Sequence, residues 1–175
     1  MKSMVDLSHE FLIPALHSQA ICIDATLGQG KDTQFFLKHN VKRVYGFEIQ
    51  EDVFNHTIQK LEDNRFQGFL IGHEHMDEMI HEPIDAIVFN FGYFPNGDKT
   101  ILTSSDTSVQ AVLQAWKLLK IKGRMALVLY PHRDGLVEAK KIEACVKTFS
   151  NCQVHKLTNF IQEDCPYLIL IEKRR

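Results

Sequence analysis

The chain has 175 residues, of which 45% are hydrophobic and 24% are charged, and its formal net charge is −2. This length fits one domain with a substantial core, and the composition excludes the disordered and fibrous classes. The charge also excludes general attraction of nucleic acid by the whole protein, so an RNA partner would need a local basic patch.

No apolar run approaches the ~20 residues of a membrane span, and Asp6, His9 and Glu10 interrupt the apolar residues at the N-terminus. We therefore expect a cytoplasmic protein without membrane contact. The four cysteines lie far apart without a Cys-x-x-Cys pair, which favours reduced core residues over a zinc knuckle or a disulfide framework. We find no linker or internal repeat and predict a single domain over residues 1–175.

The first half of the chain alternates patterns typical of helices and strands. A short amphipathic helix, interrupted or bent at Pro14, is expected to cover one edge of a sheet. The run at 85–89 is continuously apolar, which predicts a strand buried on both faces. In chain order we expect helix 4–18, strand 20–24, helix 32–38, strand 41–47, helix 50–64, strand 66–71 interrupted by Gly68, a short helix before Pro83, and strand 85–89.

The second half begins with residues 90–105, which are too long for a tight turn and are predicted to form an ordered functional loop. Ser105 or Asp106 can cap a helix that runs to Lys120, with Gly123 as its C-terminal stop. Strand 125–130 and helix 136–149 follow. The chain closes with strands 153–157 and 167–172, joined directly without a helix pattern between them.

Five strand-then-helix repeats and a terminal hairpin predict a three-layer α/β/α sandwich around a mostly parallel seven-stranded sheet. Nicotinamide-binding domains usually end with a sixth parallel strand, whereas methyltransferases that use S-adenosylmethionine (SAM) end with an antiparallel one. The antiparallel C-terminal hairpin therefore favours the Rossmann-like class I SAM-dependent methyltransferase fold, and an NAD-dependent oxidoreductase is the weaker alternative.

A glycine-containing turn follows the first predicted strand. Asp24, Thr26, Gly28 and Gly30 resemble the first methyltransferase motif, with Thr26 where that motif has its first glycine. The dinucleotide fingerprint fits less well, because its third glycine would fall at Thr33. Asp24 is suitably placed for the turn amides or for the amino group of methionine. A strand-to-helix turn without a ligand is the alternative.

Polar residues also follow the next two predicted strands. Glu48 closes the second strand, where a carboxylate can accept hydrogen bonds from both ribose hydroxyls, and Gln50 could flank the ribose. His73, Glu74 and His75 follow the third strand, near the expected adenine pocket. Zinc is disfavoured, because no further His or Cys cluster completes a set of three or four ligands.

The loop after the fourth strand points to the acceptor of the reaction. Asn90 stands like the Asn in the Asn-Pro-Pro-Tyr loops of methyltransferases that act on amino nitrogens. A carbonyl oxygen at this position can accept a hydrogen bond from the target N–H and orient the nitrogen lone pair. Tyr93 or Phe94 could stack on a base, and the alternative is a loop packed by its own aromatic rings.

Taken together, these segments resemble the small YtqB/MnmM-type methyltransferases over nearly the whole chain. The motifs are IDATLGQGKDT, GFEIQ, LIGHEH, FNFGYFPNGDKTILTSSDT, LVLYPHRDG and LILIEK. The resemblance implies SAM as cofactor, homodimers, and methylation of the amino group of 5-aminomethyluridine, often 2-thiolated, at the wobble position of transfer RNA. The anticodon stem-loop would be the partner.

The motifs and the resemblance together assign the site residues. Some positions depart from the family pattern: Gln29, Lys31 and Glu48 replace residues more usual there, and His132 stands one position early. Catalytic roles are expected for Asn90, Tyr93, Asp98 and His132, with Asp98 or His132 as candidate proton acceptors. Cofactor binding is expected from Asp24, Thr26, Gly28, Gln29, Gly30, Asp32, Glu48, Gln50, His75 and Asn90, and no metal is expected.

Other acceptors stay open at this point: ribosomal RNA, a small amine, or no acceptor at all in a module that only binds SAM. An RNA partner would need cations near the site. The candidate groups are Lys117, Lys120, Lys122 and Arg124; Arg133, Lys140 and Lys141; and Lys173, Arg174 and Arg175.

Overall fold

The fold was obtained as a computed structural model that describes residues 1–92, 105–131, 135–162 and 164–175. Its sheet has seven strands in the order β3-β2-β1-β4-β5-β7-β6. The strands are β1 (Ile21–Asp24), β2 (Arg43–Glu48), β3 (Phe66–Leu70), β4 (Ile84–Asn90), β5 (Leu119–Leu129), β6 (Cys152–Leu157) and β7 (Tyr167–Lys173). The helices are α1 (Met4–Leu12), α2 (Lys31–Lys38), α3 (Glu51–Ile58), α4 (Met76–Met79), α5 (Ser105–Leu118) and α6 (Gly135–Val146), with short 3-10 helices at Ile13–Ala15 and His73–His75.

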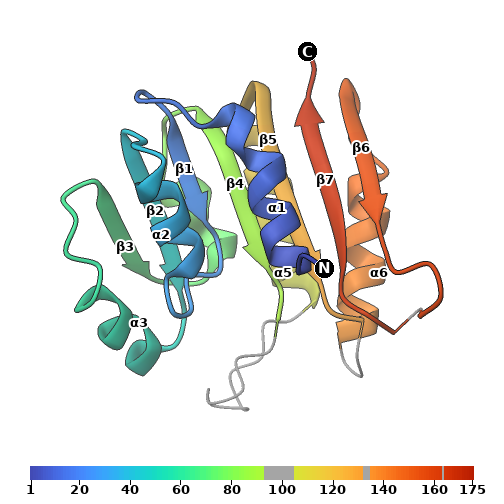
Figure 1. The fold of residues 1–175 in the computed structure, drawn as a ribbon, viewed down its shortest axis with the longest axis horizontal. Helices are drawn as coiled ribbons and strands as arrows, with labels where there is room; N and C mark the ends of the chain where they lie inside the picture. Colours follow the sequence, from blue (N-terminus) through green and yellow to red (C-terminus); the bar gives the residue numbers. More distant parts are fainter. Residues whose placement is uncertain (93–104, 132–134, 163) are drawn as a thin grey trace.

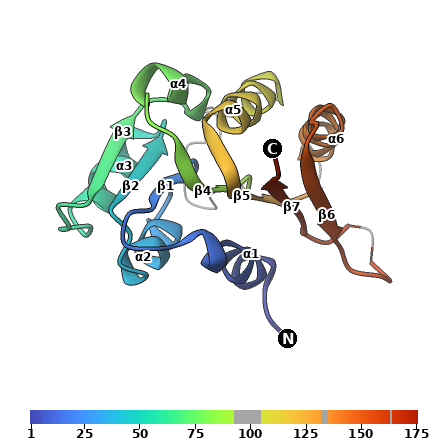
Figure 2. The same ribbon diagram turned by 90° about the horizontal axis from the view of Figure 1, so that it is seen from above.

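Strands β1 to β5 are parallel, whereas β7 runs antiparallel to both β5 and β6. This arrangement confirms the predicted mostly parallel sheet with an antiparallel C-terminal hairpin. Helices lie on both sides of the sheet, with α1 and α2 on one face and α4, α5 and α6 on the other (Figures 1 and 2).

The alternation of side chains along β4 shows why both faces need cover. Ala86 and Val88 pack with Leu12 and Phe36 under α1 and α2. Ile87 and Phe89 belong to the larger cluster under α4, α5 and α6. Because successive side chains of a strand point to opposite faces, a continuous apolar run must be covered on both sides.

The N-terminal helix does not cover an edge of the sheet as predicted. It lies over β4, β5 and β7, and Leu12 is fully buried there. Arg124 in β5 fixes this position, because its Nη1 donates to the carbonyl of Phe11 at 2.7 Å and its guanidinium lies 4.9 Å from the Phe11 ring centre. Pro14 ends the helix, since the chain passes into a 3-10 turn after Leu12.

The boundary between α5 and β5 also differs from the prediction. The helix ends at Leu118, and Leu119 already pairs with Ile84 of β4. The sequence that looked like a helix end is a bulge, after which pairing resumes at Arg124 and Ala86. Gly123 is needed there because a Cβ would lie 2.9 Å from the carbonyl oxygen of Lys120, and not because it stops a helix.

Gly68 does not interrupt β3. It pairs in register with Gly46 of β2, and a Cβ on Gly68 would lie 2.9 Å from the ring of Phe54 in α3. The glycine therefore gives the α3 aromatic ring room to lie on the strand. No helix among the described residues is long and apolar enough to cross a membrane.

Candidate functional site

The predicted site residues that the structure describes gather where the parallel strands end. The carboxyl ends of β1, β2, β3 and β4 meet at one edge of the sheet, the lower edge in Figure 1. In open α/β sheets, ligands bind at this edge. Three of the predicted catalytic residues, Tyr93, Asp98 and His132, lie outside the described residues.

Two glycines shape the loop after β1. Gly28 and Gly30 have φ angles of +46° and +72°, in the left-handed region that favours glycine. At Gly30 space is also short, because a Cβ would lie 2.9 Å from the Leu61 side chain and 3.0 Å from that of Thr57. Thr57 in α3 also donates its hydroxyl to the Gly28 carbonyl at 2.6 Å. These contacts with Thr57 and Leu61 hold the loop against α3 and the residues that follow it.

Asp24, buried at the end of β1, also holds this loop. One carboxylate oxygen accepts from the amide of Thr26 at 3.3 Å, and the other accepts from the amide and hydroxyl of Thr33 at 3.0 and 2.8 Å. Burial, reinforced by the negative charge of Asp32, raises the pKa of Asp24 to about 7. Of the two predicted roles, the structure shows the contact with turn amides. The carboxylate is fully buried and presents no oxygen to the surface.

Asp32 in the first turn of α2 makes a contact that sequence reasoning missed. Its Oδ1 lies 2.6 Å from Nε2 of His9 in α1, and the His9 ring stacks on Phe35 with 3.9 Å between ring centres. The N-terminal helix therefore contributes a side chain to the support of the loop. No local signal pairs His9 with Asp32, because the contact depends on where α1 packs.

Glu48 at the end of β2 also holds the loop that contains Gly28 and Gly30. One of its oxygens accepts from the Gly28 amide at 3.1 Å, and the other accepts from the amides of Ile49 and Gln50 at 2.9 Å each. Gln29 lies exposed on the loop between the two glycines. The structure thus brings Glu48 and the glycine loop together as predicted, with Gln50 at the start of α3 beside them.

Thr26 connects the loop to the end of β4. Its hydroxyl oxygen accepts a hydrogen bond from the amide of Asn90 at 2.8 Å. This contact gives a structural reason for threonine at a position where the motif usually has glycine. The side-chain oxygen of Asn90 is buried and has no hydrogen-bond partner among the described residues. Such an acceptor is costly to leave unsatisfied, which suggests that a ligand supplies the donor.

Of the polar residues after β3, His75 is the one that is predicted to bind the cofactor. His75 is partly exposed and pairs with Glu78 at 2.8 Å, which raises its pKa. His73 is instead the buried one, with its Nδ1 3.1 Å from the Ala25 carbonyl. Its ring centre lies 5.8 Å from that of Phe89 and 6.0 Å from that of Phe91.

His73 carries an unused acceptor. Burial lowers the pKa of the ring, so the neutral form is favoured, with Nδ1 donating to the carbonyl and Nε2 left as an acceptor. This Nε2 and the buried Oε2 of Glu74 have no hydrogen-bond partner among the described residues. The sequence showed three polar residues here without indicating which of them turn inward.

Tyr130 lies beside the end of β4. A Cβ on Gly92 would lie 3.1 Å from its ring, so the Tyr130 ring lies against the backbone of Gly92. Burial, together with the negative charge of Asp32, raises the pKa of the Tyr130 hydroxyl and keeps it protonated. No group of three His, Cys, Asp or Glu side chains in the described part of the chain could hold a metal ion.

The chemistry of this edge is that of an acceptor-rich nucleoside site. Glu48, His73, Glu74 and Asn90 present oxygens or a nitrogen that accept hydrogen bonds, and several of them lack donors. The ribose hydroxyls, the adenine amino group and the methionine amino group of SAM are donors of the matching kind. The residues present therefore fit SAM.

Comparisons with known proteins identify the family. Residues 44–172 match the family described as "Putative rRNA methylase". A tRNA (mnm(5)s(2)U34)-methyltransferase, chloroplastic, of Arabidopsis thaliana is 31% identical over 160 residues, or 82% of this chain. The match covers 58% of the length of that relative.

Two solved structures extend the likeness to the whole chain. SMU.1697c from Streptococcus mutans, solved in complex with SAH, is 35% identical, with a TM-score of 0.90 and 99% of each chain covered. An rRNA methylase from Streptococcus thermophilus is 29% identical, with a TM-score of 0.83, and the match covers 100% of this chain and 99% of the other. The chain therefore belongs to the rRNA methylase family of class I, SAM-dependent methyltransferases.

Proposed function

We propose that this protein transfers a methyl group to the amino group of 5-aminomethyluridine, with or without 2-thiolation, at the wobble position of transfer RNA. The observation that carries the proposal is the unpaired side-chain oxygen of Asn90 at the carboxyl end of β4. The name of the Arabidopsis relative, a tRNA (mnm(5)s(2)U34)-methyltransferase, supports this substrate.

SAM, when bound, supplies the methyl group from its sulfonium. The chain holds it with the glycine loop, with Glu48 and with the buried acceptors His73 and Glu74. The hydroxyl oxygen of Thr26 accepts a hydrogen bond from the backbone amide of Asn90 at 2.8 Å. This bond fixes the backbone of Asn90 and thereby limits the positions of its side chain. Its Oδ1 then accepts a hydrogen bond from the target amine and orients the nitrogen lone pair.

The amine must be neutral to react. An alkyl amine is mostly protonated in water, and transfer to a partly buried edge of the sheet favours its neutral form. Asp98 and His132 stay candidates for the residue that accepts the proton. Homodimer formation and a cytoplasmic location stay predictions.

The test is mass spectrometry of wobble nucleosides from cells that lack this protein. We expect the unmethylated aminomethyl form to accumulate and the methylated form to return when the gene is restored. Restoration with an Asn90→Ala variant should leave the unmethylated form in place, provided that the variant still binds S-adenosylhomocysteine. An unchanged nucleoside profile in the deletion strain would reject the proposal.

The family description favours a second substrate, ribosomal RNA. The purified protein can be given SAM with either an aminomethyl-modified anticodon stem-loop or ribosomal RNA. If only the ribosomal RNA is methylated, ribosomal RNA and not transfer RNA is the substrate.

A further inference from the structure

The start of α2, where the glycine loop ends, has no side-chain cap of its own. Its N-cap residue is Gly30, which has no side chain to accept a hydrogen bond from the first-turn amides. Asp24 of β1 accepts from the Thr33 amide instead, at 3.0 Å. The backbone that leaves the glycine loop is therefore fixed by side chains that come from other elements.

His9 of α1 is the second such side chain. Helices α1 and α2 lie side by side on one face of the sheet (Figures 1 and 2), and Nε2 of His9 lies 2.6 Å from Oδ1 of Asp32 in the first turn of α2. A carboxylate only accepts hydrogen bonds, so Nε2 is the donor. Stacking on Phe35, with 5° between the ring planes, orients the His9 ring. The His9 and Asp32 side chains are 19% and 8% exposed, so water competes little for this contact.

Asp32 depends on this partner because a second carboxylate lies near it. Burial and then the negative charge of Asp32 raise the pKa of Asp24, so the two carboxylates repel each other. Without His9, the nearly buried Asp32 carboxylate lacks its donor, and turning toward water is then favourable. Asp32 is the second residue of α2, so this movement would shift the first turn of the helix and the Gly30 backbone next to it.

We propose that His9 is a positioning residue for the methyl donor: by holding Asp32, it keeps the glycine loop and the start of α2 in the conformation that binds SAM. The inference goes beyond the proposed function, because it concerns the donor and applies with any methyl acceptor. A contact that only stabilised the fold would not change the affinity for the cofactor, and this difference can be measured.

The test measures the Kd of S-adenosylhomocysteine for purified variants by calorimetry. His9→Ala removes the donor to Asp32, and we expect the Kd to rise roughly tenfold, as for the loss of one hydrogen bond to a charged group. His9→Gln places an amide N–H near the position of Nε2 and should restore most of the affinity. His9→Phe keeps a ring on Phe35 but has no nitrogen, so it should bind as weakly as His9→Ala and replaces that variant if the latter does not fold.

The matched control is Ser8→Ala, in the same helix. Ser8 is fully buried, and its hydroxyl donates to the Val5 carbonyl at 2.7 Å. Its loss weakens α1 but leaves the Asp32 carboxylate with its donor. We expect both alanine variants to unfold at lower urea concentrations than the wild type, and only His9→Ala to lose affinity. A wild-type Kd for His9→Ala or His9→Phe, or the same change in Kd for Ser8→Ala, would overturn the proposal.

A double-mutant cycle with Asp32→Asn shows whether His9 acts through Asp32. If it does, adding His9→Ala to Asp32→Asn raises the Kd by less than His9→Ala does in the wild type. Fully additive effects would show that His9 acts by another route and would also overturn the proposal. Binding of S-adenosylhomocysteine requires no RNA. A protein that methylates no transfer RNA would therefore end the proposed function and leave the role of His9 in place.

Discussion

At the scale of single residues, the candidate site depends on polar side chains whose partners lie far away in the sequence. Thr26 accepts from the Asn90 amide, and His9 contacts Asp32 across the space between α1 and α2. The motif positions of Asp24, Gly28 and Glu48 were predictable, because short patterns specify the turn. The unpaired acceptors were not, because burial is a property of the folded chain.

Replacing Thr26 with valine tests the connection to Asn90. Valine has nearly the same shape but no acceptor, so the Asn90 amide loses its partner. We expect about 1–3 kcal/mol less stability and a fall in kcat on the order of tenfold, because Asn90 is no longer held. Thr148→Val is the control, since that hydroxyl bonds the Cys145 carbonyl at the end of α6 and should leave kcat unchanged. Equal kcat in both variants would contradict the role of Thr26.

His73 predicts a dependence of stability on pH. Its pKa is lowered in the folded protein, so below the ordinary value of about 6.5 the unfolded chain binds a proton that the folded chain resists. Stability is therefore lost as the pH falls below that value. His73→Asn keeps a donor near the Ala25 carbonyl and cannot titrate.

The measurement is urea unfolding of both proteins from pH 5 to pH 8. The asparagine variant should be less stable at pH 8, because it leaves a cavity, and the difference should shrink toward pH 5. Other titrating groups, including Asp24, contribute equally to both curves. A constant difference across this range would show that the pKa of His73 is the same in the folded and the unfolded protein.

At the scale of elements, sequence patterns located most strands and helices but not all of their ends. The apolar period of α5 continues beyond Leu118 and predicts a helix to Lys120. In the structure the helix ends at Leu118, because Leu119 packs on the sheet. The Lys120 amine then donates to both carboxylate oxygens of Asp85, at 2.9 Å each. Such tertiary contacts override the local preference for helix.

The glycine loop offers a prediction that separates backbone strain from crowding. Gly28→Ala and Gly30→Ala both place a side chain on a left-handed backbone, at a cost of about 1–2 kcal/mol. Only at Gly30 would the new methyl also collide with Leu61 and Thr57, since a Cβ at Gly28 has no atom nearer than 3.8 Å. We therefore expect Gly30→Ala to be the less stable variant by about 1–3 kcal/mol, measured by urea unfolding. Equal loss in the two would show that Leu61 moves aside freely.

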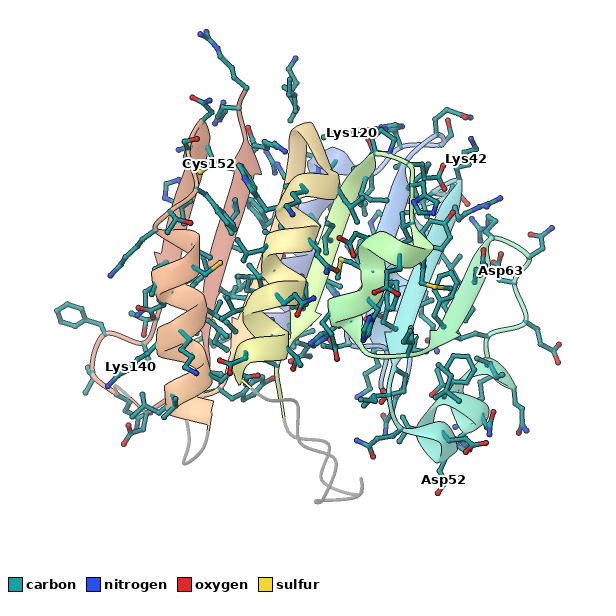
Figure 3. All side chains as sticks on the ribbon, turned by 180° about the vertical axis from the view of Figure 1, so that it is seen from behind. Lys42, Asp52, Asp63, Lys120, Lys140 and Cys152 are labelled. Atoms are coloured by element: carbon teal, nitrogen blue, oxygen red, sulfur yellow. The ribbon has the colours of Figure 1, made fainter. Side chains whose placement is uncertain are left out.

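At the scale of the whole molecule, the position of the basic groups relative to the site decides which could meet RNA. Arg124 and Arg174 both pair with Glu172 near the amino-terminal ends of the parallel strands, opposite the site. Lys120 lies at that edge too, whereas Lys140 of α6 lies toward the carboxyl edge (Figure 3). Of the three groups found in the sequence, the one around Lys140 is the best placed.

Charge reversal tests this placement. Lys140→Glu should raise the KM for the stem-loop and reduce the salt slope of binding by about one to two charges, because a cation near the RNA becomes an anion. Lys122→Glu makes the same change at an exposed position in the β5 bulge, at the far edge, and should have little effect. A larger effect from Lys122 would place the RNA at the other edge of the sheet.

The hydrogen bond between Thr26 and Asn90 joins residues 64 positions apart, and β1 pairs with β4 over a similar separation. The β6–β7 hairpin, in contrast, joins neighbouring segments of the chain. Long-range parallel pairing forms slowly compared with local contacts. During refolding, amide protons of the hairpin should therefore become protected before the chain regains binding of S-adenosylhomocysteine, so that ligand binding reports the completion of folding.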